Sequence, residues 1–313
     1  MESAAKLHWV REIMKTLDQI RPAITSLDAI PAIPAIVQPL ASMLQLPVEQ
    51  VNVEQVVQLV SYDSSIAAQC LRMANSPLFG RRKTETVRSA ILALGLKRVQ
   101  AILLGCCLNR IVPADKWAFD ATTFWRHSLG CALISRKLAT LIGYTEPEKA
   151  YLSGLLHDLG MLVNTLACTD EYRKCFIAAR EERVSVESAE LKELGFTHCQ
   201  SGKILAEHWK FSADVVAVIE FHHHVAETHS DPALVALIHL SDLLCRLRDL
   251  GYGYYETMSV DLARDEAWLS LLQYCPQLAT VDLARLTLDI DGAMDEIIAL
   301  VDAVFQPAPS PSR

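Results

Sequence analysis

The stretch TEPEKAYLSGLLHDLG, residues 145–160, decides the fold. Its apolar residues recur at helical spacing, Pro147 falls in the first turn, and Gly160 marks the expected end of the helix. Thr145, with Glu148 three residues later, predicts a capping box. His157 and Asp158 follow the apolar run directly. Since a buried carboxylate needs a partner, this helix carries a chemical signal as well as a packing signal.

The same helical period continues outward over nearly all of the 313 residues. The segment TTFWRHSLGCALISRKLATLIG at 122–143 predicts a long helix that ends at a glycine. Few strand patterns occur, and there is no Asn-Gly or Asp-Gly hairpin signal. The sequence therefore predicts an all-α fold, with further helices at 3–20, 35–45, 51–63, 64–76, 86–93, 97–111, 170–183, 187–194, 197–209, 212–223, 232–249, 262–273 and 291–305.

Composition limits the class of protein. Hydrophobic residues make up 51% of the chain and charged residues 21%, which is typical of a folded domain with a large core. No run of 18 apolar residues is present, and the N-terminus lacks the uninterrupted apolar stretch of a signal peptide. The nine cysteines are odd in number and form no CxxC pair. They predict reduced thiols in a cytoplasmic protein and argue against a zinc–thiolate site. The lack of an apolar run argues against a membrane partner.

Charge is uneven along the chain, whose net charge is −8. Between residues 70 and 110 eight basic residues face one acidic residue, Glu85. Such a patch suits a phosphate group or an acidic partner, although a solvated helix face is the plainer interpretation. Without an RNP motif, zinc finger or clear helix-turn-helix, nucleic-acid binding is the weakest interpretation. The residues expected in this patch are Arg81, Arg82, Lys83, Arg88, Lys97 and Arg98.

Polar residues on core-facing stripes are the main signal for function. Each one alone is best interpreted as a hydrogen-bonded core residue, as we expect for His8, His208, His224, His229 and His239. Several imidazoles and two carboxylates on separate helices are stabilised together if they converge on a divalent cation such as iron, manganese or zinc. The set follows the order His127, His157, Asp158, His198, His222, His223 and Asp242.

This order resembles the HD superfamily of metal-dependent phosphohydrolases, and the spacings from His127 to His157 and from His198 to His222 are similar to its two-metal HD-GYP branch. The resemblance implies one metal on His127, His157, Asp158 and Asp242. It implies a second metal on Asp158, as the bridge, with His198, His222 and His223. Such a pair activates a hydroxide for attack on a phosphodiester.

The rest of the chain is similar to the HDOD domain, an HD-related output domain of bacteria. The segments that carry this resemblance are IPAIPAIVQPLASMLQLP, LRMANS at 71–76, AILALG at 90–95, WRHS, GLLHDLG and IEFHH, and they cover about residues 25–250. HDOD proteins generally act in signalling through protein contacts, and most are not regarded as active hydrolases. The expected fold is an HD-type helical bundle with an additional N-terminal helical subdomain.

Two departures separate the chain from the HD-GYP enzymes. Met161 stands where those enzymes carry a phosphate-contacting lysine, and HVAETHSDP after His223 contains no GYP element. Arg126, beside His127, is the candidate to replace the missing cation. We therefore expect a non-catalytic signalling module that retains a metal site with one or two metals. Its expected partners are other signalling proteins or a nucleotide ligand. The alternative is an active phosphohydrolase on a nucleotide or a cyclic dinucleotide.

The expected organisation has three parts. Residues 1–22 form an N-terminal helix, and 23–250 form the HDOD unit, with halves at 23–115 and 116–250. Residues 251–313 form an acidic helical extension with a Pro- and Ser-rich tail, which is expected either to pack over the bundle or to mediate a homodimer.

Overall fold

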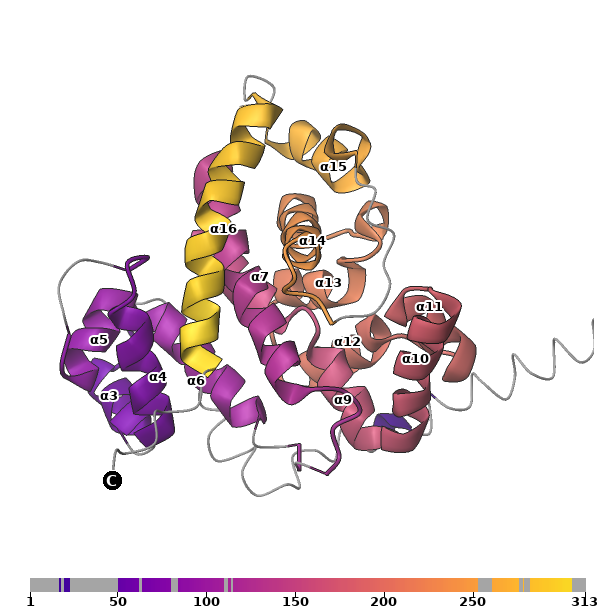
Figure 1. Cartoon of the computed structure of the whole chain (residues 1–313), viewed down its shortest axis with the longest axis horizontal. Helices are drawn as coiled ribbons and strands as arrows, with labels where there is room; N and C mark the ends of the chain where they lie inside the picture. The colour runs from indigo at the N-terminus through magenta and orange to yellow at the C-terminus, as the bar shows by residue number, and fades with distance from the viewer. Residues whose placement is uncertain are drawn as a thin grey trace, which may run out of the picture.

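The computed structural model describes most of the chain. The described residues are 17, 20–22, 50–61, 64–79, 84–109, 112–113, 115–252, 261–275, 278 and 282–305. Over these residues the chain is all-α, with fourteen α-helices and no strand (Figure 1). None of these helices has the length and apolar character needed to cross a lipid bilayer. The expected helix at 35–45, most of the expected helix at 3–20, and the tail lie outside the described residues.

Four helices form a group at one side of the molecule (Figure 1). They are α3 (Val53–Ser61), α4 (Ser64–Ala74), α5 (Val87–Leu94) and α6 (Leu96–Asn109). Thr86 caps α5 in a capping box with Ser89, and Gly95, in the positive-φ region at 86°, separates α5 from α6. Apolar residues such as Val56, Met73 and Leu94 are buried between these helices.

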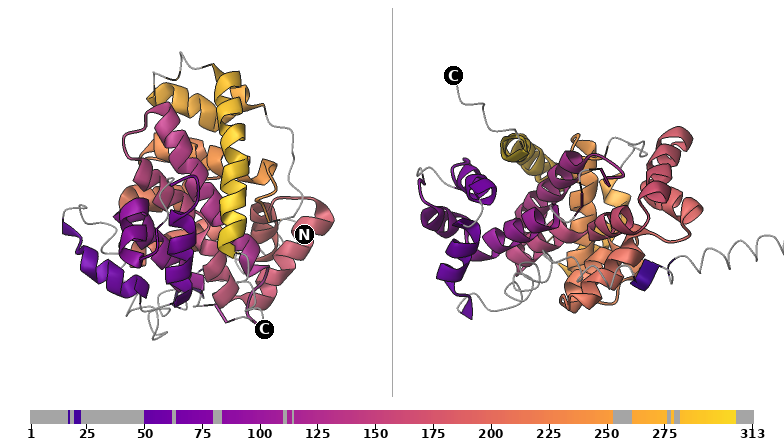
Figure 2. Two further views of the ribbon diagram at one scale, coloured as in Figure 1. Left: turned by 60° about the vertical axis from the view of Figure 1, so that its left-hand side comes forward. Right: turned by 90° about the horizontal axis from the view of Figure 1, so that it is seen from below.

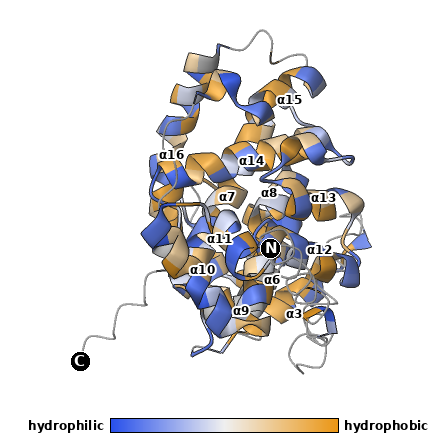
Figure 3. Cartoon of the chain, turned by 90° about the vertical axis from the view of Figure 1, so that its right-hand side faces the viewer, coloured by the Kyte–Doolittle hydropathy of each residue, from blue (hydrophilic) through white to orange (hydrophobic). Residues whose placement is uncertain are grey.

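The central helices form the body of the molecule (Figures 1 and 2). The longest of them, α7 (Ala121–Ile142), packs along α8 (Pro147–Leu156) and α14 (Pro232–Leu247). Figure 3 shows that α14 is largely hydrophobic, as expected of a helix enclosed by others. The remaining helices of this region are α9 (Leu159–Ala167), α10 (Thr169–Glu182), α11 (Val186–Glu193), α12 (His198–His208) and α13 (Ala213–Phe221).

The C-terminal extension packs over the bundle, which was one of the two expectations for it. Helix α15 (Glu266–Tyr274) lies against α14, and α16 (Leu283–Phe305) runs across α7 and reaches α4 (Figure 1). The buried face of α16 includes Ile290, Met294 and Ile297. The helix begins at Leu283, earlier than the expected start at 291.

The deciding stretch at 145–160 differs from its prediction in two ways. The prediction of a capping box is wrong, because Glu146 is the N-cap and its side chain makes no capping hydrogen bond. Glu148 binds Arg98 and Arg136 instead. The helix does not run to Gly160 either. It ends at Leu156, and α9 begins at Leu159, so His157 and Asp158 lie at the junction of two helices.

Candidate metal centre

The junction between α8 and α9 places Asp158 at the centre of a histidine cluster. Both oxygens of its buried carboxylate face imidazoles. Oδ2 lies 3.1 Å from Nε2 of His157 and 3.5 Å from Nε2 of His127. Oδ1 lies 3.4 Å from Nε2 of His198 and 3.4 Å from Nε2 of His222. One carboxylate therefore lies between two pairs of histidines.

Five separate elements supply the surrounding side chains. His127 comes from the second turn of α7, His198 from the first residue of α12, and Asp242 from α14. His222 is the C-cap of α13, and His223 follows it. Asp242 completes the first pair, with Oδ1 3.2 Å from Nε2 of His127. The structure thus brings all seven residues of the expected ligand set to one place.

The imidazoles are oriented from behind by hydrogen-bond acceptors. Nδ1 of His127 lies 2.7 Å from the carbonyl oxygen of Leu250, and Nδ1 of His157 lies 2.8 Å from that of Gly154. Nδ1 of His222 faces the carbonyl oxygens of Val218 and Ile219 at 3.1 and 3.2 Å. Because a carbonyl only accepts, Nδ1 carries the proton and Nε2 presents a lone pair to the centre. This is the usual arrangement of metal-binding histidines.

A buried carboxylate orients His198. Glu190, on α11, is fully buried and lies 2.7 Å from Nδ1 of His198. The same side chain accepts the backbone N–H of His198 at 2.8 Å and the hydroxyl of Tyr172 at 2.7 Å. The pattern of polar residues on apolar faces could have indicated Glu190, because it shares a buried face with Val186 and Ala189.

Buried nitrogen lone pairs at the centre test whether a metal fits. Nε2 of His127 lies 3.2 Å from Nε2 of His157, a contact that repels unless a proton or metal cation lies between the lone pairs. Nε2 of His198 and Nε2 of His222 are buried without a hydrogen-bond partner. The nitrogen and oxygen donors suit iron, manganese or zinc. The residues present therefore fit a divalent metal.

Electrostatics lead to the same conclusion. Burial alone raises the pKa of Asp158, but His157, His222 and His198 outweigh it and hold this pKa well below its usual range. Burial lowers the pKa of His157, yet the Asp158 carboxylate raises it well above its ordinary value. In contrast, burial and the neighbouring His222 and His198 lower the pKa of His223. Carboxylates that remain charged draw protons onto the imidazoles, and a metal replaces those protons.

Cys199 is a further residue at the centre that the sequence analysis left out. Its Sγ lies 3.9 Å from Nδ1 of His222, and its donor atom groups closely with those of His198, His222 and His223. Burial raises the pKa of this thiol, but His198 and His222 bring it down to about 7. Spacing gave no signal for Cys199, because adjacent positions on a helix such as His198 and Cys199 point about 100° apart.

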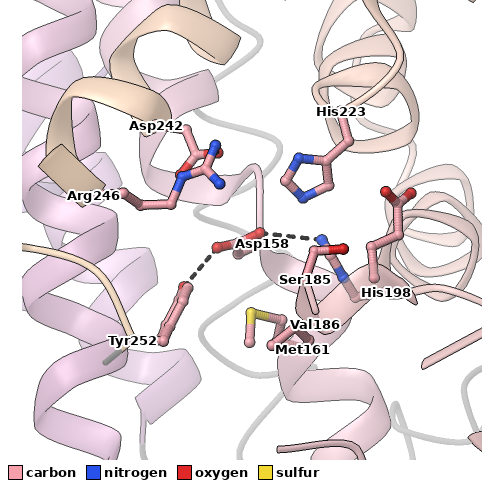
Figure 4. A pocket seen from close by; sticks show the side chains of 10 residues that line it. Asp158, Met161, Ser185, Val186, His198, His223, Asp242, Arg246 and Tyr252 are labelled. Carbon is pink, nitrogen blue, oxygen red and sulfur yellow. Dashed lines mark hydrogen bonds and ion pairs between the residues drawn. The ribbon is translucent and has the colours of Figure 1, made fainter. Parts of the chain in front are cut away.

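A small cavity opens beside Asp158 (Figure 4). Its volume is about 50 Å³, and Met161, Arg246 and Tyr252 are among its lining residues. The Tyr252 hydroxyl donates to Oδ2 of Asp158 at 2.5 Å, and the Arg246 guanidinium lies 2.9 Å from Oδ2 of Asp242. Arg246 stands four residues after Asp242, a spacing at which helix side chains pair, so the sequence offered a signal for it. The GYGY segment that contains Tyr252 has no helical period and offered none.

Those of the other expected functional residues that the structure describes are not among the residues that line this cavity. Arg126 pairs with Asp302 of α16 at 2.6 Å, so it does not replace the lysine absent at Met161. In the basic patch, Arg98 binds Glu148 and lies over the Phe79 ring, and Arg88 pairs with Glu54. Lys97 is half-buried on α6. The other three members of the patch, Arg81, Arg82 and Lys83, lie outside the described residues.

Comparison with known proteins gives one curated relative and several solved structures. An uncharacterized protein of Treponema pallidum is 23% identical over 233 residues, which are 74% of this chain. The chain spans 44% of the length of that relative. An HDOD domain protein of unknown function from Geobacter sulfurreducens is 26% identical, with a TM-score of 0.77 over 94% of this chain and 100% of that one.

Two further structures share the fold at lower identity. A protein of Shewanella amazonensis, assigned provisionally as a phosphohydrolase, is 22% identical, with a TM-score of 0.66 over 89% of this chain and 96% of its own. A protein of Marinobacter aquaeolei, assigned provisionally to signal transduction, is 20% identical, with a TM-score of 0.70 over 95% of this chain and 66% of its own. The family model of the HDOD domain matches residues 30–225, and the chain belongs to the HDOD family.

Proposed function

We propose that this chain is a regulatory HDOD module that acts in the cytoplasm through contacts with other signalling proteins and retains a metal centre without hydrolysing a nucleotide. The small size of the cavity beside Asp158 carries this proposal. Its volume of about 50 Å³ is several times smaller than the roughly 300 Å³ at which ligand pockets begin. A nucleotide or a cyclic dinucleotide does not fit between Arg246, Tyr252 and Met161 as they stand.

The proposed metal centre uses the seven residues around Asp158. One metal would be held by His127, His157, Asp158 and Asp242, and the second by Asp158 with His198, His222 and His223. The convergence of imidazole lone pairs on one carboxylate supports this assignment. When bound, a divalent metal supplies Lewis acidity and lowers the pKa of a coordinated water. In a regulatory module the same ions would hold five elements of the chain together.

The alternative is an active phosphohydrolase on a nucleotide or a cyclic dinucleotide. The completeness of the donor set favours this alternative, since seven candidate ligands lie in place. It requires the cavity to open, and Tyr252 is the side chain that has to leave Asp158. The two proposals therefore differ in one measurable property, which is turnover by the metal-loaded chain.

Metal content and hydrolysis, measured on the same sample, test the proposal. The protein is prepared without an affinity-column metal or chelator, and Asp158→Ala serves as the control. We expect one or two equivalents of iron, manganese, zinc or a similar metal in the wild type, no bound metal in the variant, and no difference between them towards bis(p-nitrophenyl) phosphate or a cyclic dinucleotide. Turnover that disappears in Asp158→Ala would establish the alternative. Equal metal contents in the two proteins would contradict the metal centre.

A further inference from the structure

The C-terminal extension contacts the elements that carry the candidate metal ligands. Helix α15 packs on α14, which carries Asp242, and α16 packs on α7, which carries His127 (Figure 1). Arg126, the residue before His127, pairs with Asp302 of α16 at 2.6 Å. None of the seven candidate ligands lies on α15 or α16. The extension therefore reaches the centre only through neighbouring residues.

His239 forms the first contact between α15 and the second group of ligands. It lies on α14 with a side chain that is 15% exposed, and its Nδ1 lies 2.7 Å from the carbonyl oxygen of His222. Because a carbonyl only accepts, Nδ1 donates this hydrogen bond. On the other side of the ring, Nε2 lies 3.6 Å from Oδ2 of Asp265, the N-cap of α15. One imidazole thus bridges the backbone of a candidate ligand and the start of α15.

Glu266, the first residue of α15, forms the second contact. Its Oε1 accepts the backbone N–H of Val225 at 3.2 Å. Val225 is buried and begins the short 3-10 helix η4 (Val225–Glu227), two residues after His223. The segment that carries His222 and His223 is therefore tied to the start of α15 at both of its ends.

Packing alone does not account for these two contacts. Helix α15 already buries an apolar face next to α14, which includes Trp268 and Leu271. The contacts instead hold a segment with few bonds of its own, because a 3-10 helix of three residues has little internal stability. Histidine ligands bind a metal tightly when their rings are held in position. The affinity of the centre for metal therefore depends on the docking of α15.

We propose that the docking of α15 is coupled to metal occupancy at His222 and His223, so that the C-terminal extension is the regulatory element of the centre. This coupling rests on the proposed metal centre. A signalling partner that draws α15 away from the bundle loosens the segment from His222 to Val225 and weakens retention of the second metal. Since coupling between two sites is reciprocal, metal binding also tightens the docking of α15. The extension thereby reports the state of the centre to other proteins.

Hydrogen exchange of the full chain, with and without Mn²⁺, tests the response of α15. Its amides are compared with those of α3, which packs mainly on α4, α5 and α6 and lies outside the ligand-bearing elements. A metal that only raises global stability slows exchange in both helices alike. We expect Mn²⁺ to slow exchange in α15 by at least about fivefold more than in α3.

Two substitutions test the contacts separately, with Mn²⁺ affinity followed through the electron paramagnetic resonance signal of the free ion. Glu266→Ala removes the acceptor of the Val225 N–H. Asp265→Asn keeps an N-cap oxygen but removes the charge that faces His239. Glu296→Ala, at an exposed glutamate of α16, is the matched control. We expect at least about fivefold weaker Mn²⁺ binding in Glu266→Ala, a smaller loss in Asp265→Asn, and wild-type affinity in the control.

Several results would overturn the coupling. They are equal slowing of exchange in α15 and α3, unchanged Mn²⁺ affinity in Glu266→Ala, or an equal loss of affinity in Glu296→Ala. If α15 detaches in Glu266→Ala, the affinity still decides, because a detached α15 with full Mn²⁺ affinity contradicts the proposal. A wild type that retains no Mn²⁺ would overturn the metal centre and the coupling with it. A wild type that retains Mn²⁺ without a response in α15 would overturn the coupling alone.

Discussion

Glu190 shows how much of the centre depends on residues that do not face it. Its buried carboxylate accepts three hydrogen bonds, from Nδ1 and the backbone N–H of His198 and from Tyr172. We predict that Glu190→Gln weakens retention of the second metal by about 10- to 100-fold, because the amide no longer fixes the imidazole and its basicity. Competition with a chromophoric chelator measures this affinity.

Glu193→Gln provides the control for this substitution. Glu193 ends the same helix, α11, and its side chain is exposed. The variant therefore makes the same chemical change without touching His198. Equal metal affinities in the two variants would remove Glu190 from the support of the centre.

The candidate site could be predicted from the sequence at the positions where polar side chains interrupt the apolar face of a helix. His127 and Asp242 stand on apolar stripes of long helices, and His157 with Asp158 ends an apolar run, so periodicity alone selects them. Tyr252 was out of reach, because the GYGY segment has no period from which to depart. The long-range ion pairs also could not be predicted, because the sequence does not indicate that Arg126 binds Asp302, which lies on a helix about 175 residues away.

At the scale of elements, the crossing of α9 and α12 positions the second group of histidines. Gly160 and Gly202 face each other there, and a Cβ on Gly202 would lie 2.9 Å from the backbone nitrogen of Gly160. A Cβ on Gly160 would collide with the carbonyl group of His198. Glycine at both positions therefore allows α12 to bring His198 within reach of Asp158.

We predict that Gly160→Ala lowers the free energy of unfolding by about 1–3 kcal/mol and reduces metal retention, because α12 has to move away. Gly292→Ala is the matched control. Gly292 lies in α16 with nothing near its Cβ position, so alanine there should stabilise the chain by up to about 1 kcal/mol. Urea denaturation measures both changes. A Gly160→Ala protein as stable as the control, with full metal content, would mean that this crossing has room to relax.

The helical period predicted the fold class and most helices, but boundaries depended on tertiary contacts. The predicted end at Gly160 failed because the glycine serves helix packing inside α9. The predicted capping box failed because Glu148 forms a tertiary ion pair, with Oε2 2.9 Å from Nε of Arg98 and Oε1 2.8 Å from Nε of Arg136. A side chain three residues into a helix is also free to bind a neighbouring helix, and local spacing does not distinguish the two outcomes.

This ion pair makes a pH-dependent contribution to stability. Burial alone would raise the pKa of Glu148, but Arg98 and Arg136 outweigh it and lower the pKa below its ordinary value of 4.5. Because the folded pKa is lowered, the contribution is full above 4.5 and is lost as the pH falls through the folded value. We predict that wild type exceeds Glu148→Gln in unfolding free energy at neutral pH and that the difference shrinks below pH 4.5. A difference that does not change with pH, or a pH dependence that is equally large in an Arg98→Gln background, would contradict this origin.

At the scale of the whole molecule, an ion pair and the C-terminal helix help to join the N-terminal helices to the central bundle. Arg98 of α6 binds Glu148 of α8, and α16 spans from α4 to α7 (Figure 2). Arg248, just after α14, also pairs with Asp295 of α16 at 2.7 Å. The extension is therefore part of the described core, and we expect the N-terminal helices and the central bundle to unfold together rather than in sequence.

The inner face of α16 provides the test of this cooperativity. Ile297 is 3% exposed within the core, whereas Leu288 on the same helix is 71% exposed. Ile297→Ala should lower the free energy of unfolding by about 2–5 kcal/mol, because it removes buried methyl groups and leaves a cavity, and Leu288→Ala should leave it nearly unchanged. We expect one denaturation transition in both variants, followed by far-ultraviolet circular dichroism and by tryptophan fluorescence. Two separated transitions in Ile297→Ala would show instead that α16 only rests on a bundle that folds without it, and the extension would then be available to a partner.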